Sequence, residues 1–555
     1  MKQDRHRSIV SSRRTGGGVW RSGRKLGWRR TIVRPLVLAS GALAIALVAS
    51  PGSGTVYSQA RAFDVMEATI PELQAAMATG KVTSRELVEI YLARIAAYDE
   101  QGPALNAISV VNPNARREAD ALDAERKAKG PRGPLHGIPI IVKDNYDTAD
   151  LQTAAGSLVL AGWKPPVDAF QVKRLRAAGA VIIAKSNMHE FAYGWETIGS
   201  LFGQTRNPYA VARSAGGSSG GTGAAVAANF AAVGMGSDTC GSIRVPSSFN
   251  SLVGLRGTQG LSSRTGIVPL SATQDIGGPL ARTVTDLAIV LDETVGYDAA
   301  DPQTAESVGR IPASYTAFLD LGGLRGVRVG RVTSFPTTAN DPAVIAVFRT
   351  VLDELRVQGA EVVDVAIPDW QALFPEPNDA YFIQINDFKF DLNAYLAERP
   401  SAPVRTLEEV LASGRFSTHQ TVEPRLRNSQ SFATRDTKEY YEHLARRTAL
   451  KQAVLKAMAD NRLDALVYPT VTEKAPLLGE LQRQEAITCY LSSNSGLPAI
   501  TVPGGFTTEG FPVGVELLGR PWSEPTLIKF AYAYEQATRH RRPPPSTPAI
   551  GSSGR

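Results

Sequence analysis

Short apolar runs alternate with amphipathic segments along most of the chain. Residues 138–142 and 179–186 form continuous apolar runs, as expected of strands that are buried on both faces. Residues 169–178 and 344–358 have apolar positions at helical spacing, and Gly359 ends the second segment. Further strand-like runs lie at 327–332, 362–367, 463–470 and 495–503. This alternation predicts an α/β fold in which helices cover a sheet.

The remaining predicted helices differ in character. Thr69 opens a short helix, and Thr83 and Glu86 form a capping box before the next helix. Residues 112–130 are rich in charge and predict a helix that faces solvent. Residues 370–460 are helical in pattern and rich in aromatic side chains. These aromatic side chains either fill a core or belong to a cap that shapes a pocket.

Two glycine-rich stretches, 213–223 and 236–244, interrupt the pattern. The segment between them predicts a buried helix at 224–230 and a buried strand at 231–235, which together bring both stretches to one place. A flexible linker is the alternative, but compact apolar segments need a packed domain around them. No lysine follows the glycines as a phosphate-binding loop requires. The G-x-S-x-G match at 217–221 follows a weak strand pattern, so it does not indicate a nucleophile elbow.

Positive charge is concentrated at the N-terminus. Residues 1–34 hold 11 Lys and Arg against one acidic residue, Asp4, so the rest of the 555-residue chain carries a net charge of −3. The basic pI of about 9.2 therefore belongs to a leader segment and not to the folded protein. It gives no reason to expect a nucleic-acid partner.

Residues 1–60 predict an export signal. A basic region precedes an apolar run at 35–50, and residues 58–60 offer a small-x-small cleavage site. Residues 29–34 also resemble the twin-arginine export pattern. Because the apolar run is shorter than the roughly 20 residues of a spanning helix, we expect an exported protein, periplasmic or secreted, with no stable membrane association after signal removal. The proline-rich residues 544–555 are expected to be a disordered tail.

Cysteine and histidine usage argues against a metal centre. The two cysteines, Cys240 and Cys489, do not form a disulfide framework, and a bridge inside a glycine loop is not expected. The six histidines are scattered without metal-ligand spacing. We therefore expect no metal and no cofactor.

The second glycine stretch contains a candidate nucleophile, Ser242. No His–Asp pair accompanies it, so another base is needed. Lys143 closes a buried strand, and burial lowers the pKa of a lysine until the neutral amine is populated. Ser218, in the first glycine stretch, can pass a proton between Ser242 and Lys143. Backbone amides that can converge on a developing oxyanion belong to Thr239, Cys240, Gly241 and Ser242.

Several motifs together resemble the amidase signature family. They lie at 137–145, 216–223, 236–246, 265–286, 495–503 and 514–520, so the resemblance extends from about residue 65 to 540. It implies a single large α/β domain, residues 61–543, with a mixed β-sheet core covered by helices. It also implies hydrolysis of an amide through an acyl-enzyme intermediate, with a small-molecule or peptide amide as substrate.

The resemblance also implies the roles of the site residues. The catalytic set falls on Lys143, Ser218 and Ser242, and the family holds the Ser218 equivalent by a cis peptide bond. Gly216 and Gly217 shape that bend, and Asp238 and Arg244 are expected to pair and to brace the nucleophile loop. The oligomeric state is left open.

The chain departs from the family pattern in three places. Cys240 and Ser251 stand where glycine is common, and Arg256-Gly-Thr replaces the usual Lys-Pro-Thr. Cys240 keeps the backbone N–H, so we expect the same catalysis with a narrower acyl pocket.

Two further segments, 296–302 and 522–535, resemble secreted peptide amidases, which deamidate peptide C-termini. The core motifs are shared with glutamyl-tRNA amidotransferase, whose amidase subunit acts in the cytoplasm with partner subunits. Hydrolysis of aryl amides, carbamates or esters at the same site is one alternative function. A non-catalytic binding protein that keeps the fold is another.

Overall fold

An eleven-stranded sheet forms the centre of the computed structural model, which describes residues 63–335, 337–373 and 379–550. The strand order is β1-β3-β2-β8-β10-β9-β14-β15-β13-β11-β12. Pairs within β3-β2-β8 and β13-β11-β12 are parallel and the other pairs are antiparallel, so the predicted α/β fold with a mixed sheet is confirmed. The predicted export leader, residues 1–60, lies outside the described residues.

The strands of this sheet are β1 (Ile108–Val111), β2 (Pro139–Lys143), β3 (Val181–Ser186), β8 (Val233–Asp238), β9 (Val253–Arg256), β10 (Ile276–Ala281), β11 (Arg328–Val332), β12 (Glu361–Val365), β13 (Ala465–Pro469), β14 (Ala499–Phe506) and β15 (Pro512–Leu518). Two small hairpins pair β4 (Ile198–Gly199) with β5 (Gly203–Gln204) and β6 (Arg206–Asn207) with β7 (Ala210–Ser214).

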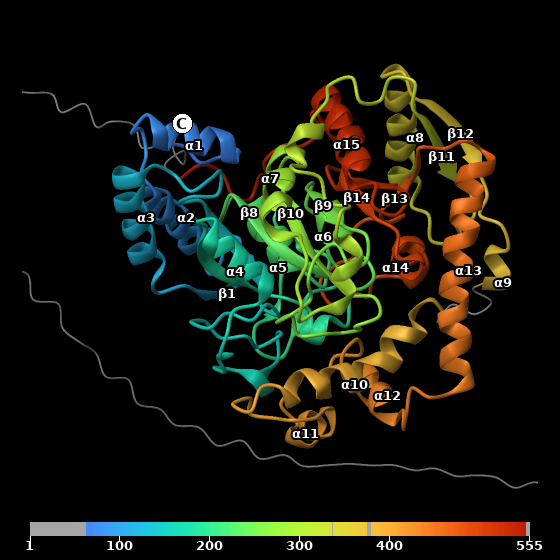
Figure 1. Ribbon diagram of the computed structural model, residues 1–555, viewed down its shortest axis with the longest axis horizontal. Coiled ribbons are helices and arrows are strands. Elements are labelled where there is room, and N and C mark those ends of the chain that lie inside the picture. The colour runs from blue at the N-terminus through green and yellow to red at the C-terminus, as the bar shows by residue number, and fades with distance from the viewer. Residues whose placement is uncertain (1–62, 336, 374–378, 551–555) are drawn as a thin grey trace, which may run out of the picture. The chain divides into compact units, whose positions relative to one another are not determined.

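The helices surround these strands in Figure 1. They are α1 (Ile70–Ala78), α2 (Ser84–Tyr98), α3 (Ala115–Lys129), α4 (Phe170–Ala177), α5 (Gly220–Ala227), α6 (Arg244–Phe249), α7 (Val284–Thr294), α8 (Pro342–Val357), α9 (Trp370–Leu373), α10 (Phe382–Ala397), α11 (Leu407–Ser413), α12 (Glu423–Ser431), α13 (Lys438–Asp460), α14 (Tyr490–Ser495) and α15 (Glu524–Thr538). Among the described residues, none of these helices is long and apolar enough to cross a membrane.

Two parallel neighbours in the sheet, β2 and β8, position the candidate chemistry. Every residue of both strands is buried, which explains why their sequences are apolar or small. Because the strands run in the same direction, Lys143 at the end of β2 and Asp238 at the end of β8 reach the same edge of the sheet.

Helix α5 begins earlier than predicted, at Gly220 instead of residue 224. Its glycines permit close packing: a Cβ on Gly221 would lie 2.2 Å from the carbonyl oxygen of Asn187 and 2.6 Å from that of Ala107. A side chain at this position would displace the backbone of the neighbouring segment. The end of the glycine run is therefore the first turn of a helix and not a loop.

The predicted helix starts near the N-terminus are confirmed. Thr69 and Thr83 both accept a hydrogen bond from the backbone N–H three residues later, and Glu72 and Glu86 complete the capping boxes.

The aromatic region 370–460 forms helices α9 to α13, and α10, α11 and α12 are grouped together in Figure 1. Phe388 of α10 is fully buried and packs against Phe191 and Tyr193, at ring-centroid distances of 5.7 Å and 4.7 Å. Tyr381, just before α10, packs against Trp195 at 5.5 Å. The region thus fills a core and also lies against the segment 191–195, which borders the candidate site.

The C-terminal residues 544–550 correct the prediction of a disordered tail. Thr547 is fully buried, and Arg94 of α2 donates to the carbonyl oxygens of Thr547 and Pro548 at 2.8 Å and 2.9 Å. The proline-rich composition was misleading because the tail is fixed by hydrogen bonds to its backbone and not by apolar side chains. Residues 551–555 lie outside the described part of the chain.

Candidate active site

Lys143 is fully buried at the end of β2 and contacts two serines. Its Nζ donates to Ser218 Oγ at 2.7 Å, to Ser237 Oγ at 2.8 Å and to the Ser237 carbonyl oxygen at 3.3 Å. Burial lowers the pKa of Lys143 to about 7, although Asp275 and Asp238 act in the opposite direction. A substantial fraction of the amine is therefore neutral near neutral pH.

Ser237 is a site residue that the sequence analysis missed. Its hydroxyl also accepts a hydrogen bond from Asn145 Nδ2 at 2.9 Å, so it fixes both Lys143 and the residue two positions further on. The sequence did contain a signal, because Ser237 is a polar residue in the otherwise apolar or glycine-containing strand β8.

Ser218 follows a cis peptide bond to Gly217, as the family resemblance implied. The N–H of His189 donates to the Ser218 carbonyl oxygen at 3.0 Å, and Thr197 Oγ1 donates to that of Gly216 at 2.7 Å. A Cβ on Gly217 would lie 2.8 Å from the carbonyl carbon of Trp195. Only glycine allows this close approach of the two backbones.

Ser242 lies in the loop between β8 and α6 and lines a narrow cavity of about 10 Å³. Among the described residues, no hydrogen bond joins the Ser218 and Ser242 hydroxyls, so the structure connects Lys143 to Ser218 and leaves the relay to Ser242 a prediction. The other residues that line the cavity are Ala192, Tyr193, Gly194, Trp195, Thr239, Cys240, Leu270 and Gln384.

The expected oxyanion donors divide into two groups. The N–H of Gly241 donates to Asp238 Oδ1 at 2.8 Å, so this amide serves the loop, and the expectation that it binds an oxyanion is corrected. The N–H groups of Thr239, Cys240 and Ser242 have no acceptor within the part of the chain that the structure describes. They are available to a negatively charged oxygen in the cavity.

A buried ion network supports the nucleophile loop. Asp238 pairs with Arg244 at 3.1 Å, and Arg244 also pairs with Glu516 of β15 at 2.5 Å. Arg256 pairs with Asp238 at 3.1 Å, a role that the sequence analysis missed. Burial alone would raise the pKa of Asp238, but Arg244 and Arg256 outweigh it and hold the pKa well below its usual range. Asp238 thus stays ionised and anchors the amides of Gly241 and Ile243.

Cys240 and Cys489 form a disulfide, with their Cα atoms 5.2 Å apart, which corrects the expectation of unpaired cysteines. The two residues are 249 positions apart in sequence, so their proximity could not be read from spacing. Cys489 is the N-cap residue of α14, which packs beside the nucleophile loop.

Ser251 also departs from the family pattern without disturbing the fold. Its φ of 52° lies in the left-handed region, which explains why glycine is common at this position.

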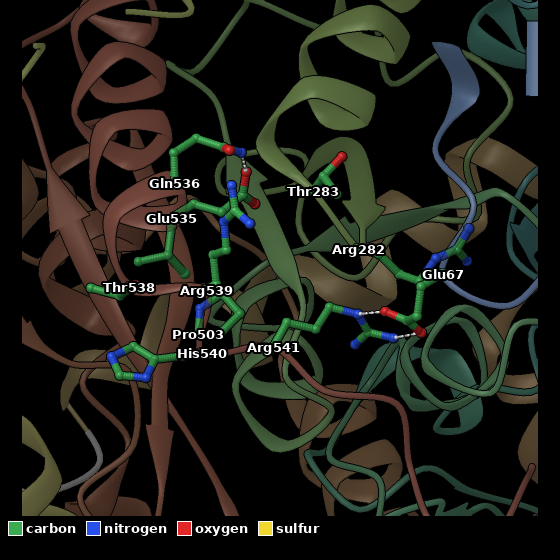
Figure 2. Close-up of a pocket in the computed structure, with 11 residues that line it drawn as sticks. Glu67, Arg282, Thr283, Pro503, Glu535, Gln536, Thr538, Arg539, His540 and Arg541 are labelled. Atoms are coloured by element: carbon green, nitrogen blue, oxygen red, sulfur yellow. Dashed lines mark hydrogen bonds and ion pairs between the residues drawn. The ribbon is translucent and has the colours of Figure 1, made fainter. Parts of the chain in front are cut away.

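A much larger cavity, of about 420 Å³, lies elsewhere (Figure 2). It is lined by Arg282 and Thr283, which directly follow β10, and by the end of α15. The last residue of β10, Ala281, pairs with Val233, the first residue of β8, so this cavity lies at the opposite sheet edge from Asp238 and Lys143. It contains none of the candidate catalytic residues.

Comparison with known proteins agrees with the fold and the site. Residues 86–528 match the family model described as Amidase, and the chain therefore belongs to the amidase family. The predicted resemblance is confirmed.

Individual relatives cover nearly the whole chain. A probable amidase of Arabidopsis thaliana is 36% identical over 518 residues, which cover 90% of this chain and 96% of the relative. The amidase component of glutamyl-tRNA(Gln) amidotransferase from Salinispora arenicola is 34% identical over 496 residues, which cover 87% and 99%. The crystal structure of native peptide amidase from Stenotrophomonas maltophilia is 39% identical, with a TM-score of 0.78, and the match covers 86% of this chain and 98% of that chain. The protein is thus a hydrolase that acts on amides.

Proposed function

We propose that the chain hydrolyses linear carboxamides, with C-terminal peptide amides as preferred substrates, through Lys143, Ser218 and Ser242. The 2.7 Å hydrogen bond from the fully buried Lys143 Nζ to Ser218 Oγ carries the proposal, because it links a base whose pKa is about 7 to a hydroxyl that can relay a proton.

In the first half-reaction, Ser242 Oγ attacks the amide carbonyl carbon. Its proton passes to Ser218, whose own proton passes to the neutral amine of Lys143. The carbonyl oxygen becomes an oxyanion, which accepts hydrogen bonds from the free backbone amides of the nucleophile loop. The protonated lysine then returns a proton through Ser218 to the leaving nitrogen, and the C–N bond breaks to release ammonia.

In the second half-reaction, water attacks the acyl group on Ser242. Lys143 accepts a proton from the water through Ser218, and the second tetrahedral intermediate collapses to the carboxylic acid and the free Ser242 hydroxyl. The same three side chains therefore act in both halves of the reaction.

The preference for peptide amides rests on similarity. Two solved peptide amidase structures have TM-scores of 0.80 and 0.78 to this chain, above the 0.67 of the glutamyl-tRNA(Gln) amidotransferase component from Thermotoga maritima. A narrow cavity with an aromatic wall at Trp195 also suits a small primary amide more than a bulky aryl amide.

The test uses one acyl group with four leaving groups. An N-acetylated dipeptide is supplied as its primary amide, anilide, methyl ester and free acid, and release of ammonia or of the other product is measured. We expect turnover of the primary amide, loss of turnover in Ser242→Ala, and labelling of Ser242 by an acyl-trapping inhibitor.

Two results would contradict the proposal. Turnover of the anilide or ester without the primary amide would favour the alternative hydrolase activities. Binding without turnover of any of the four compounds would favour a non-catalytic binding protein.

A further inference from the structure

The disulfide joins the nucleophile loop to a separate rigid element. Cys240 lies two residues before Ser242, and Cys489 begins α14, whose residues are all buried. Thr488, next to Cys489, donates from its Oγ1 to the carbonyl oxygens of Pro469 and Thr470, both at 2.9 Å. The bridge therefore fastens the loop to a segment that is itself anchored at the end of β13.

The other contacts of the loop hold the residues around Cys240. Thr239 Oγ1 donates to Asp275 Oδ1 at 2.5 Å, and Asp238 fixes the amides of Gly241 and Ile243. The Cys240 peptide itself is held through its carbonyl oxygen, which accepts a hydrogen bond from Trp195 Nε1 at 2.8 Å, and through its side chain.

Gly241 makes this peptide dependent on its side-chain contact. Its φ of +85° lies in the left-handed region, where glycine has wide conformational freedom, so the backbone after Cys240 offers little intrinsic rigidity. A Cβ at Gly241 would lie 2.9 Å from Cys489 Cβ, which shows how closely the bridge packs on this residue.

We propose that the Cys240–Cys489 disulfide is a positioning element that holds the Cys240 amide toward the oxyanion. The inference rests on the proposed function, in which this amide stabilises the tetrahedral intermediate. Cutting the bridge leaves the amide in the chain but frees its direction, so transition-state stabilisation weakens while substrate binding changes little. The fully active enzyme is then the oxidised enzyme.

The first test compares Cys489→Ala and Cys240→Ala with the control Ser493→Ala. Ser493 Oγ contacts Cys240 Sγ at 3.2 Å but does not belong to the bridge. The kcat, the KM and the affinity for a peptide aldehyde, whose Ser242 adduct carries the oxyanion, are measured well below each melting temperature.

We expect kcat to fall about 10- to 100-fold in both cysteine variants, less than the roughly 10²- to 10³-fold cost of deleting an oxyanion donor. Aldehyde affinity should fall by a similar factor, KM should change less than about threefold, and Ser493→Ala should resemble wild type. Cysteine variants that lose only melting temperature and keep wild-type kcat and aldehyde affinity would overturn the proposal. Inactivity of the wild type on amides would instead refute the proposed function.

A second measurement avoids mutants that fail to fold. Dithiothreitol passes two electrons and two protons to the bridge: the Sγ–Sγ bond breaks, both cysteines become thiols, and the dithiol closes to its cyclic disulfide. In wild type that remains folded by circular dichroism, kcat should fall in proportion to the thiols formed and return on reoxidation. Full activity with both thiols free would overturn the proposal.

Discussion

Lys143 and Lys185 are two buried lysines at the ends of neighbouring strands, and their surroundings differ. Lys185 Nζ donates to Tyr146 O, Thr148 Oγ1, Gln152 O and Thr153 Oγ1, so its hydrogen bonds go to structural acceptors. Lys143 Nζ instead reaches Ser218, beside the cavity that Ser242 lines. Burial lowers the pKa of Lys143 to about 7 and that of Lys185 to about 8, so pKa alone does not identify the base.

We expect Lys143→Met to reduce kcat by about 10²- to 10⁴-fold, because it removes the general base. The matched Lys185→Met should lower the melting temperature and keep kcat within about fivefold.

The same base predicts the pH dependence of the wild type. Because the amine of Lys143 is reactive when neutral, kcat/KM should rise with pH through about 7 and then level off. A rate that stays constant between about pH 5 and 9, with chemistry limiting, would refute a lysine base.

Ser218 and Ser219 provide a second matched pair in one loop. Ser218→Ala should lower kcat far more than it changes KM, since alanine fills the bend but carries no proton. Ser219 Oγ donates only to the Ser237 carbonyl oxygen, at 3.2 Å, so Ser219→Ala should keep most activity. A Ser218→Ala kcat within about tenfold of wild type, roughly 1.4 kcal/mol of barrier, would remove Ser218 from the mechanism.

At the scale of elements, sequence patterns predicted the centre of the fold better than its edges. Strands β2, β3 and β8 were predictable because strands that are buried on both faces must be nearly all apolar or small. Helix α14 was not predicted, because it is polar yet fully buried. Its Ser492 and Asn494 donate to the carbonyl oxygens of Leu497 and Ala380, so tertiary hydrogen bonds replace the apolar face of an ordinary helix.

The candidate site divides in the same way. The sequence indicated Lys143, Ser218 and Ser242 because each lies in a local motif. Arg256 and the Cys240–Cys489 pair depend on contacts between distant segments, which no local pattern contains.

Helices α7 and α15 are joined by a carboxylate that predicts a pH dependence of stability. Glu535 of α15 accepts a hydrogen bond from the N–H of Val284, the first residue of α7, and burial raises the pKa of Glu535 to about 7 (Figure 2). The folded state thus binds a proton more tightly than the unfolded state, whose carboxyl has a pKa of about 4.5. The stability contributed by this group is present below about pH 4.5 and is lost as the pH rises to about 7.

Glu535→Gln keeps an acceptor for Val284 and removes the titration. We expect the stability of this variant relative to wild type to be higher at pH 8 than at pH 5, by about 1 kcal/mol or more. Urea unfolding at both pH values measures the difference, with the exposed Glu408→Gln as control. An equal offset at the two pH values would contradict this assignment.

At the scale of the whole molecule, the export leader remains a prediction, because residues 1–60 lie outside the described structure. Export should remove the 11 cations of residues 1–34, and the mature chain should begin near Arg61. N-terminal sequencing of protein from outside the cytoplasm measures this directly. Mature protein that still contains Arg29 and Arg30 would contradict it.

Both ends of the described chain contact Asn229, at the turn after α5. Glu67 exchanges hydrogen bonds with the Asn229 side chain, while Arg94 donates to the Asn229 carbonyl oxygen and to those of Thr547 and Pro548. A short linker from residue 550 to residue 63 would therefore close the chain into a ring without crossing the catalytic edge of the sheet. Opening that ring at the exposed residues Gly309 and Arg310 would give a circular permutant with the same sheet, disulfide and active site, and new ends at a surface loop.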